Sequence, residues 1–168
     1  MQSSDATGSA GESRRHLIPL DETAASESVV LWTIENLYRA GDTIHLYRVL
    51  PAGQFTVLGG DLTIMPEIIE EDPAAQKAKE ESACAYIAAH FELKLVGHKI
   101  PYEVELVRCY VDNDALGACI CSRAEQLGAC TVVMAKHPKG AVVEFFVGSV
   151  TSYCVHHATC PVVVLHVG

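Results

Sequence analysis

The stretch FFVGSVTSYCVHHATCPVVVLHV, residues 145–167, decides the fold. Gly148 and Ser149 stand at the start of a helix expected at about residues 149–157, and a nearly continuous apolar strand follows from Pro161. The Gly-Ser pair has two interpretations. The free N–H groups of a helix start bind phosphate, but serine also caps helices that bind nothing.

Upstream of this stretch, strand-like and helix-like segments alternate. Apolar runs predict strands at residues 15–20, 43–51, 102–111, 130–135 and 161–167, and helical spacing predicts helices from about Val30 to Gly41, at 74–91, at about 113–127 and at 149–157. Alternation of this kind predicts an α/β three-layer sandwich, with four helices on a five-stranded parallel sheet. Ligands bind such sheets beyond the carboxyl ends of the strands, where the strand order reverses.

Length and charge set limits on the class of protein. With 168 residues, the chain fits a Ser/Gly/Ala-rich tail at 1–13 and one domain at 14–168. A net charge of -9 argues against nucleic acid and anionic membranes as partners, and no apolar run approaches a membrane span. The seven cysteines are an odd number within apolar runs, so we expect reduced, buried thiols in a cytoplasmic protein, with no metal site.

Two features of the middle of the chain give weaker expectations. The segment 53–72 is rich in glycine and proline, and its length predicts a mobile flap or a surface meander. In the helix that follows, a stripe of small residues at helical spacing predicts close approach to the sheet: Ala75, Ala78, Ser82, Ala85 and Ala89.

The sequence resembles the universal stress protein family over residues 14–167. The resemblance rests on RHLIPLDET (15–23) and on the pattern Gly-Ser-Val, short helix, Ala-Thr-Cys-Pro-Val and apolar strand at the end of the chain. It implies an adenine nucleotide alpha hydrolase-like fold with strand order 3-2-1-4-5, homodimers and, in one branch, ATP or AMP at the switch point.

The resemblance also implies a set of binding residues. Pro19, Leu20 and Asp21 would lie along the adenine and ribose. Val49 and Met134 would pack near the base, and Gly148, Ser149, Val150 and Thr151 would offer helix N–H groups and hydroxyls to a phosphate.

The phosphate loop departs from the family pattern. In the ATP-binding branch, a glycine is followed after two residues by a second glycine and, after nine more, by glycine and serine or threonine. Counting back from Gly148 places Pro138 and Ala135 at the first two glycines. Proline fixes φ and has no N–H to donate, so it is the more serious loss. His137, together with the phosphate-neutralising lysines Lys136 and Lys139, could replace part of what the glycines supplied, or form only a solvated loop.

Two functional hypotheses follow. In the first, the protein is a homodimeric stress-response sensor or regulator that binds ATP or AMP, with or without Mg²⁺. In the second, it is a nucleotide-free dimeric interaction module that acts on an unknown regulatory protein partner. In both, the apolar edge strand Pro161–Val167 pairs with its mate in the dimer. The sequence shows no catalytic constellation, although slow nucleotide hydrolysis stays compatible with it.

Overall fold

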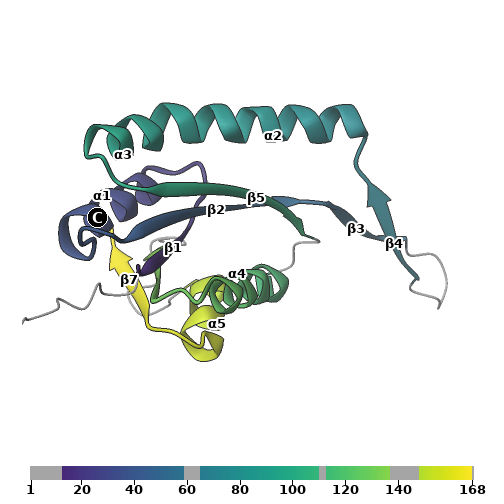
Figure 1. Cartoon of the computed structure of the whole chain (residues 1–168). Helices are drawn as coiled ribbons and strands as arrows, with labels where there is room; N and C mark the ends of the chain where they lie inside the picture. Colours follow the sequence, from purple (N-terminus) through teal and green to yellow (C-terminus); the bar gives the residue numbers. More distant parts are fainter. Residues whose placement is uncertain (1–12, 59–64, 110–112, 137–147, 168) are drawn as a thin grey trace, which may run out of the picture.

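A computed structural model describes residues 13–58, 65–109, 113–136 and 148–167. Five strands form one parallel sheet in the order β5-β2-β1-β6-β7, which is the predicted order 3-2-1-4-5 counted along the main strands (Figure 1). The strands are β1 (Arg15–Pro19), β2 (Thr43–Pro51), β5 (Tyr102–Cys109), β6 (Thr131–Lys136) and β7 (Val162–His166).

The centre of the sheet is apolar on both faces because helices cover both. Along β1, Leu17 packs toward α4 and α5, whereas Ile18 packs toward α1 and the helix that contains α2. Both side chains are fully buried. Successive side chains of a strand point to opposite faces of the sheet, so consecutive apolar residues enter two separate cores. This explains why β1 and β6 are continuous apolar runs.

Four helical segments make the outer layers. They are α1 (Ala24–Asn36), a continuous helix made of α2 (Pro73–Ile87), η1 (Ala88–Glu92) and α3 (Leu93–Gly97), then α4 (Asn113–Leu127) and α5 (Ser149–His157). Gly128 ends α4 with a φ of 58°, as its position predicts. Gly41 does not cap α1: the helix ends at Asn36, and Gly41 lies in the turn before β2 with a φ of 97°.

The predicted flap or meander is instead largely a β-hairpin. β3 (Gly53–Leu58) and β4 (Met65–Glu70) pair antiparallel as a separate two-stranded sheet. β3 follows β2 after the single residue Ala52, so the hairpin continues the direction of β2 beyond the main sheet (Figure 1). The prediction was wrong because glycine and proline were taken as evidence against strands. Each of the two strands contains one of these residues, at a position that does not prevent strand pairing.

The small-residue stripe was also wrong. Ala78, Ser82, Ala85 and Ala89 are exposed, and the row that packs on the sheet is Ala83, Ile87, Phe91 and Leu95. Residues spaced by four drift around an α-helix by about 40° per step, and the wider π-helical turn of η1 compensates for this drift. Burial of larger apolar groups outweighed close backbone approach.

Two smaller expectations can be compared with the structure. Among the described residues, no helix is long and apolar enough to cross a membrane. The cysteines are less buried than predicted: Cys154 is buried, but Cys84 is exposed and the other five are half-buried.

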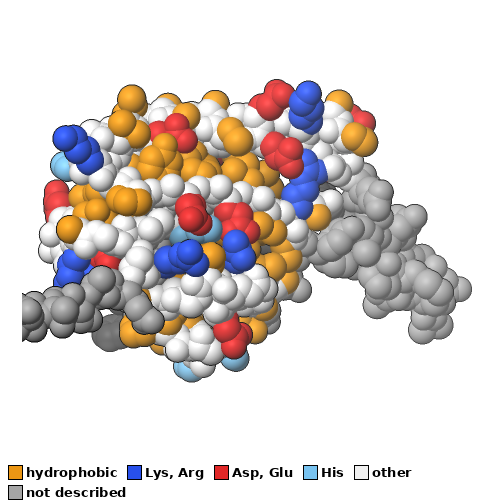
Figure 2. Space-filling view, viewed as in Figure 1, with side chains coloured by type: hydrophobic (Ala, Val, Ile, Leu, Met, Phe, Trp, Pro, Cys, Tyr) orange, Lys and Arg blue, Asp and Glu red, His pale blue; other side chains and the backbone are white. Residues whose placement is uncertain are grey.

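In the face turned to the viewer in Figure 2, hydrophobic side chains show between α2 and β5, above a central group of acidic, basic and histidine side chains.

Candidate functional site

A cavity of about 190 Å³ lies at the carboxyl ends of β1, β2 and β6. The chain after β1 crosses to β2 on one side, and β6 lies on the other, so this is the switch point of the sheet. We call this cavity the crevice. It is lined by Pro19, Leu20, Asp21, Ser26, Tyr47, Arg48, Val49, Leu116, Ile120, Met134, Ala135, Val150 and Thr151.

Asp21 joins the end of β1 to the start of α1. Its Oδ1 accepts hydrogen bonds from the Ser26 hydroxyl at 2.6 Å, from the Thr23 hydroxyl at 2.5 Å and from the Thr23 N–H at 3.2 Å. Thr23 is the N-cap of α1. The Asp21 carboxylate therefore holds the capping residue in place, and its negative charge interacts favourably with the positive end of the helix dipole. The structure therefore assigns Asp21 a structural role at the rim of the crevice.

Arg48 brings a positive charge to the crevice from β2. Its Nη1 donates to the Leu20 carbonyl at 3.1 Å, and its Nη2 to Glu22 Oε1 at 3.3 Å. Its Nε is buried and has no hydrogen-bond partner among the described residues. A buried unpaired donor costs free energy, and an acceptor on a ligand would relieve that cost.

The opposite wall depends on a close approach of α4 and α5. A Cβ on Gly117 would lie 2.6 Å from the ring and 2.8 Å from the Cβ of Tyr153, so only glycine allows this contact. The approach places Leu116 and Ile120 of α4 beside Val150 and Thr151 of α5 in the lining.

Gly148 is the N-cap of α5 and has no side-chain cap. Within the described part of the chain, the first N–H groups of the helix therefore lie next to the crevice without a capping side chain.

The structure brings together eight of the predicted binding residues. Pro19, Leu20, Asp21, Val49, Met134, Ala135, Val150 and Thr151 all line the crevice. Gly148 and Ser149 sit at its edge, at the start of α5. The Nζ of Lys136 lies 2.8 Å from the Nε2 of His166 on β7, and Lys136 is absent from the lining. His137, Pro138 and Lys139 lie outside the described residues.

Five residues of the lining were not predicted from the sequence: Ser26, Tyr47, Arg48, Leu116 and Ile120. Three of them carried a signal. Leu116 and Ile120 are one turn apart on a predicted helix, which marks a shared face. Arg48 is a charged residue near the end of a buried strand, a position that needs a partner or a role.

The comparison with known families decides the identity. The universal stress protein family matches residues 12–166, nearly the whole chain. The chain belongs to the universal stress protein family.

Two plant members of the family are curated relatives. Universal stress protein PHOS32 of Arabidopsis thaliana is 32% identical over 170 residues, which is 95% of this chain and 67% of that protein. Universal stress protein PHOS34 of the same plant is 29% identical over 174 residues, 95% of this chain and 64% of that protein. The chain thus spans about two thirds of the length of these relatives.

Solved universal stress proteins share the fold. One from Burkholderia pseudomallei has a TM-score of 0.61 at 17% identity, covering 90% of this chain and 94% of its own. Another, described as a universal stress protein in complex with cAMP, has a TM-score of 0.52 at 14% identity, covering 91% of this chain and 96% of its own. These likenesses confirm the predicted α/β fold.

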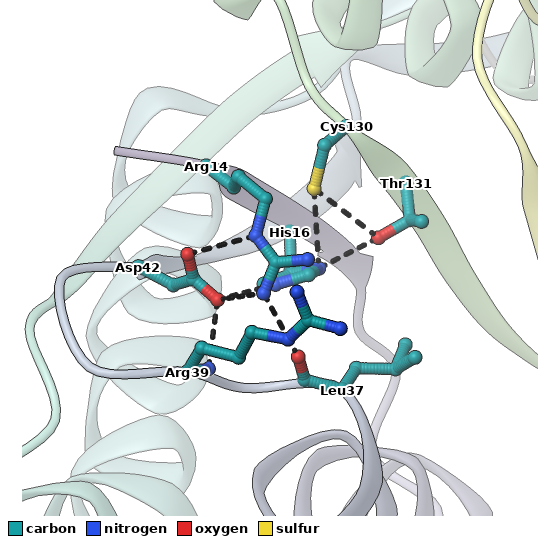
Figure 3. Close-up of polar contacts among 7 residues, drawn as sticks. All are labelled: Arg14, His16, Leu37, Arg39, Asp42, Cys130 and Thr131. Carbon is teal, nitrogen blue, oxygen red and sulfur yellow. Dashed lines mark hydrogen bonds and ion pairs between the residues drawn. The ribbon is translucent and has the colours of Figure 1, made fainter. Parts of the chain in front are cut away.

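A second polar group in this universal stress protein lies at the other edge of the sheet. We call it the amino-edge cluster: Arg14, His16, Asp42, Cys130 and Thr131 (Figure 3). The Arg14 guanidinium donates to both oxygens of Asp42, at 3.0 and 2.5 Å. Asp42 also accepts from the Arg39 N–H at 2.8 Å. The side chain of Asp42 is 5% exposed.

His16 lies between the two halves of the amino-edge cluster. Burial lowers the pKa of His16, so the ring is neutral near pH 7. Its Nε2–H then donates to Asp42 at 3.3 Å, and its Nδ1 accepts from the Thr131 hydroxyl at 2.7 Å. Burial by itself would raise the pKa of Asp42, but hydrogen bonds from Arg14, the Arg39 backbone and His16 outweigh it and lower the pKa to about 2. The cluster holds the starts of β1 and β6 and the turn before β2 together.

Proposed function

We propose that this universal stress protein binds an adenine nucleotide, ATP or AMP, in the crevice and works as a sensor or regulator in stress response. One observation carries the proposal: residues from distant parts of the chain, expected to contact adenine, ribose and phosphate, converge on a single cavity at the switch point. A relative described in complex with cAMP supports the choice of ligand class.

The lining suits the parts of a nucleotide. Val49, Met134 and Ile120 offer apolar surface for a base, and Arg48 offers a cation and an unpaired donor. The start of α5 adds N–H groups and the Thr151 hydroxyl for a phosphate. A volume of about 190 Å³ is below the roughly 300 Å³ of a typical whole-ligand site, so part of the nucleotide would lie over the mouth of the crevice.

The first experiment asks what the protein carries. Nucleotide is released by acid from protein purified without added ligand, identified by mass and counted per chain. Near-stoichiometric ATP or AMP would support the proposal.

Titration of ATP and AMP into ligand-free protein completes the test, with Val150→Phe to fill the crevice and Val155→Phe as a matched control. Val155 lies on the same helix and is 51% exposed, so only the first variant should lose binding. No bound nucleotide and no thermal shift at millimolar ATP or AMP would contradict the proposal.

That negative result is what the second hypothesis expects. Ala135 and Pro138 stand where the ATP-binding branch has glycines, which favours a nucleotide-free interaction module with a protein partner. The fold and the family membership hold for both hypotheses.

A homodimer through Pro161–Val167 belongs to both hypotheses as well. Within the described residues, β7 ends the sheet and pairs only with β6, and its four apolar residues Val162–Leu165 are half-buried. An apolar edge strand is protected when it meets its two-fold mate. Sedimentation velocity tests this: we expect a dimer in the wild type and a monomer in Val164→Lys, and a wild-type monomer would contradict it.

A further inference from the structure

Two cysteines from different elements meet on the side of α4 that faces β5. The Sγ of Cys119 on α4 lies 2.8 Å from the Sγ of Cys109, the last residue of β5. Both residues are half-buried and carry reduced thiols. We propose that Cys109 and Cys119 form an oxidation site that closes into an intramolecular disulfide and ties the end of β5 to α4. This inference is independent of the proposed nucleotide function.

The periodicity of both elements explains the meeting. Glu105 and Cys109 are four apart on β5 and share one face of the strand, and Cys119 and Arg123 are one turn apart on α4. Arg123 Nε donates to Glu105 Oε2 at 2.7 Å. This ion pair fixes the helix against the strand one turn from the sulfurs, so the cysteine contact belongs to a defined register.

A small oxidant can reach the pair because neither cysteine is fully buried. On the Cys119 side, a hollow of about 420 Å³ is lined by Tyr47, Glu105, Val107, Ala118, Cys119, Ser122, Arg123 and Gln126. Cys154 lies on the same side of the sheet as α4, but it is buried. Burial raises its pKa to about 12. Its thiol is therefore protonated and, unlike those of the half-buried pair, shielded from an oxidant.

The two thiols have different roles. Cys119 donates an S–H hydrogen bond to the Cys109 sulfur. Burial, followed by this contact, raises the pKa of Cys119 to about 11, so the Cys119 thiol stays protonated. Cys109 is then the attacking thiol and Cys119 the resolving one.

The oxidant we propose is a hydroperoxide such as hydrogen peroxide. The Cys109 sulfur attacks one peroxide oxygen; the S–O bond forms as the O–O bond breaks, and the departing hydroxide takes the Cys109 proton and leaves as water. The Cys119 sulfur then attacks the Cys109 sulfur; the S–S bond forms, the S–O bond breaks, and the second oxygen leaves as water with the Cys119 proton. Two thiols lose two electrons, and the peroxide gains them.

The test maps the disulfide in the full chain. Reduced protein is treated with hydrogen peroxide at a low molar excess, free thiols are blocked with N-ethylmaleimide, and the protein is cleaved both before aspartate and after arginine. Cys109 then lies in the peptide 109–111 and Cys119 in the peptide 114–123, so a Cys109–Cys119 disulfide joins two otherwise separate short peptides, with a mass about 2 Da below their sum.

Four variants sharpen the test. Cys109→Ser and Cys119→Ser should each abolish the linked peptide, whereas Cys121→Ala and Cys84→Ser should retain it in most chains. Cys121 is the matched control because it lies on the same helix, two residues from Cys119. A wild-type protein that resists peroxide, or that links other cysteines first, overturns the proposal, and this result does not depend on whether any variant folds.

Discussion

The amino and carboxyl edges of the sheet both carry charged groups, but they use them differently. At the amino edge, Arg14, His16 and Asp42 bind one another, and their ionisable atoms meet protein partners at 2.5 to 3.3 Å. At the carboxyl edge, the charged groups border a cavity, and Arg48 has a buried N–H without a described partner. A saturated cluster stabilises the fold, whereas an unsaturated one is available to a ligand.

The largest expected effect comes from breaking the amino edge. Asp42→Asn removes the charge that Arg14 and His16 share and turns an amide NH₂ toward N–H donors, so we expect a loss of about 3 kcal/mol in unfolding free energy. Urea unfolding measures it. Nucleotide affinity of the folded variant should be unchanged, and a variant as stable as the wild type would show that the cluster contributes little.

Acid should weaken the same edge in two steps. His16 has a folded pKa below 6.5, so its contribution is complete above about pH 6.5 and is lost as the pH falls toward the folded value. Asp42 has a folded pKa of about 2 against an ordinary 3.8, so about 2 kcal/mol is lost as the pH falls through that window. Urea titrations at several pH values should show both steps.

The variants separate these two steps. In Asp42→Asn the lower step should disappear, because the group that titrates there is gone. An unchanged acid profile in that variant would assign the lower step to other carboxylates.

Gly117→Ala should affect both stability and the crevice. The added methyl group clashes with Tyr153, and the better helix propensity of alanine offsets part of that cost, leaving about 1 to 2 kcal/mol of destabilisation. Because α4 and α5 would separate, nucleotide affinity should fall as well. Gly97→Ala is the control, since nothing lies within 4 Å of its added Cβ. Equal stability of the two variants would argue against close helix contact.

The smallest stability effect is expected at Asp21. Asn keeps an oxygen that can accept from Thr23 and Ser26, so Asp21→Asn should cost at most about 1 kcal/mol. If Asp21 also accepts a ribose hydroxyl, affinity for AMP should fall about tenfold, since a charge-assisted hydrogen bond is lost. Calorimetric titration measures this, and unchanged affinity would leave Asp21 with only its role at the helix cap.

The sequence predicted the fold because the apolar periods of strands and helices are local signals. It also predicted the cavity residues at the strand ends, such as Asp21 and Val49, because parallel strands place their carboxyl ends along one edge. The Cys109–Cys119 contact depends instead on how α4 packs against the end of β5, and the amino-edge cluster depends on long-range register. His16 and Thr131 are 115 residues apart, and no local pattern links them.

The errors have a common physical origin. The predicted stripe on α2 relied on residue size alone, and the buried row follows Ile87 and Phe91 because large apolar groups gain more from burial. The hairpin of β3 and β4 was missed because glycine and proline were read as turn signals. Arg48 was missed because it was read as part of an apolar strand.

The position of β1 also determines when the domain can be completed during its synthesis. β1 is made first, but its neighbour in the sheet, β6, is made much later. Thr131 of β6, which contacts His16 of β1, follows it by 115 residues in the chain. The β1–β2 pair therefore waits with one edge and one apolar face uncovered while most of the chain is translated. A nascent chain of this kind benefits from chaperones, and its folding is slow relative to proteins with local contacts.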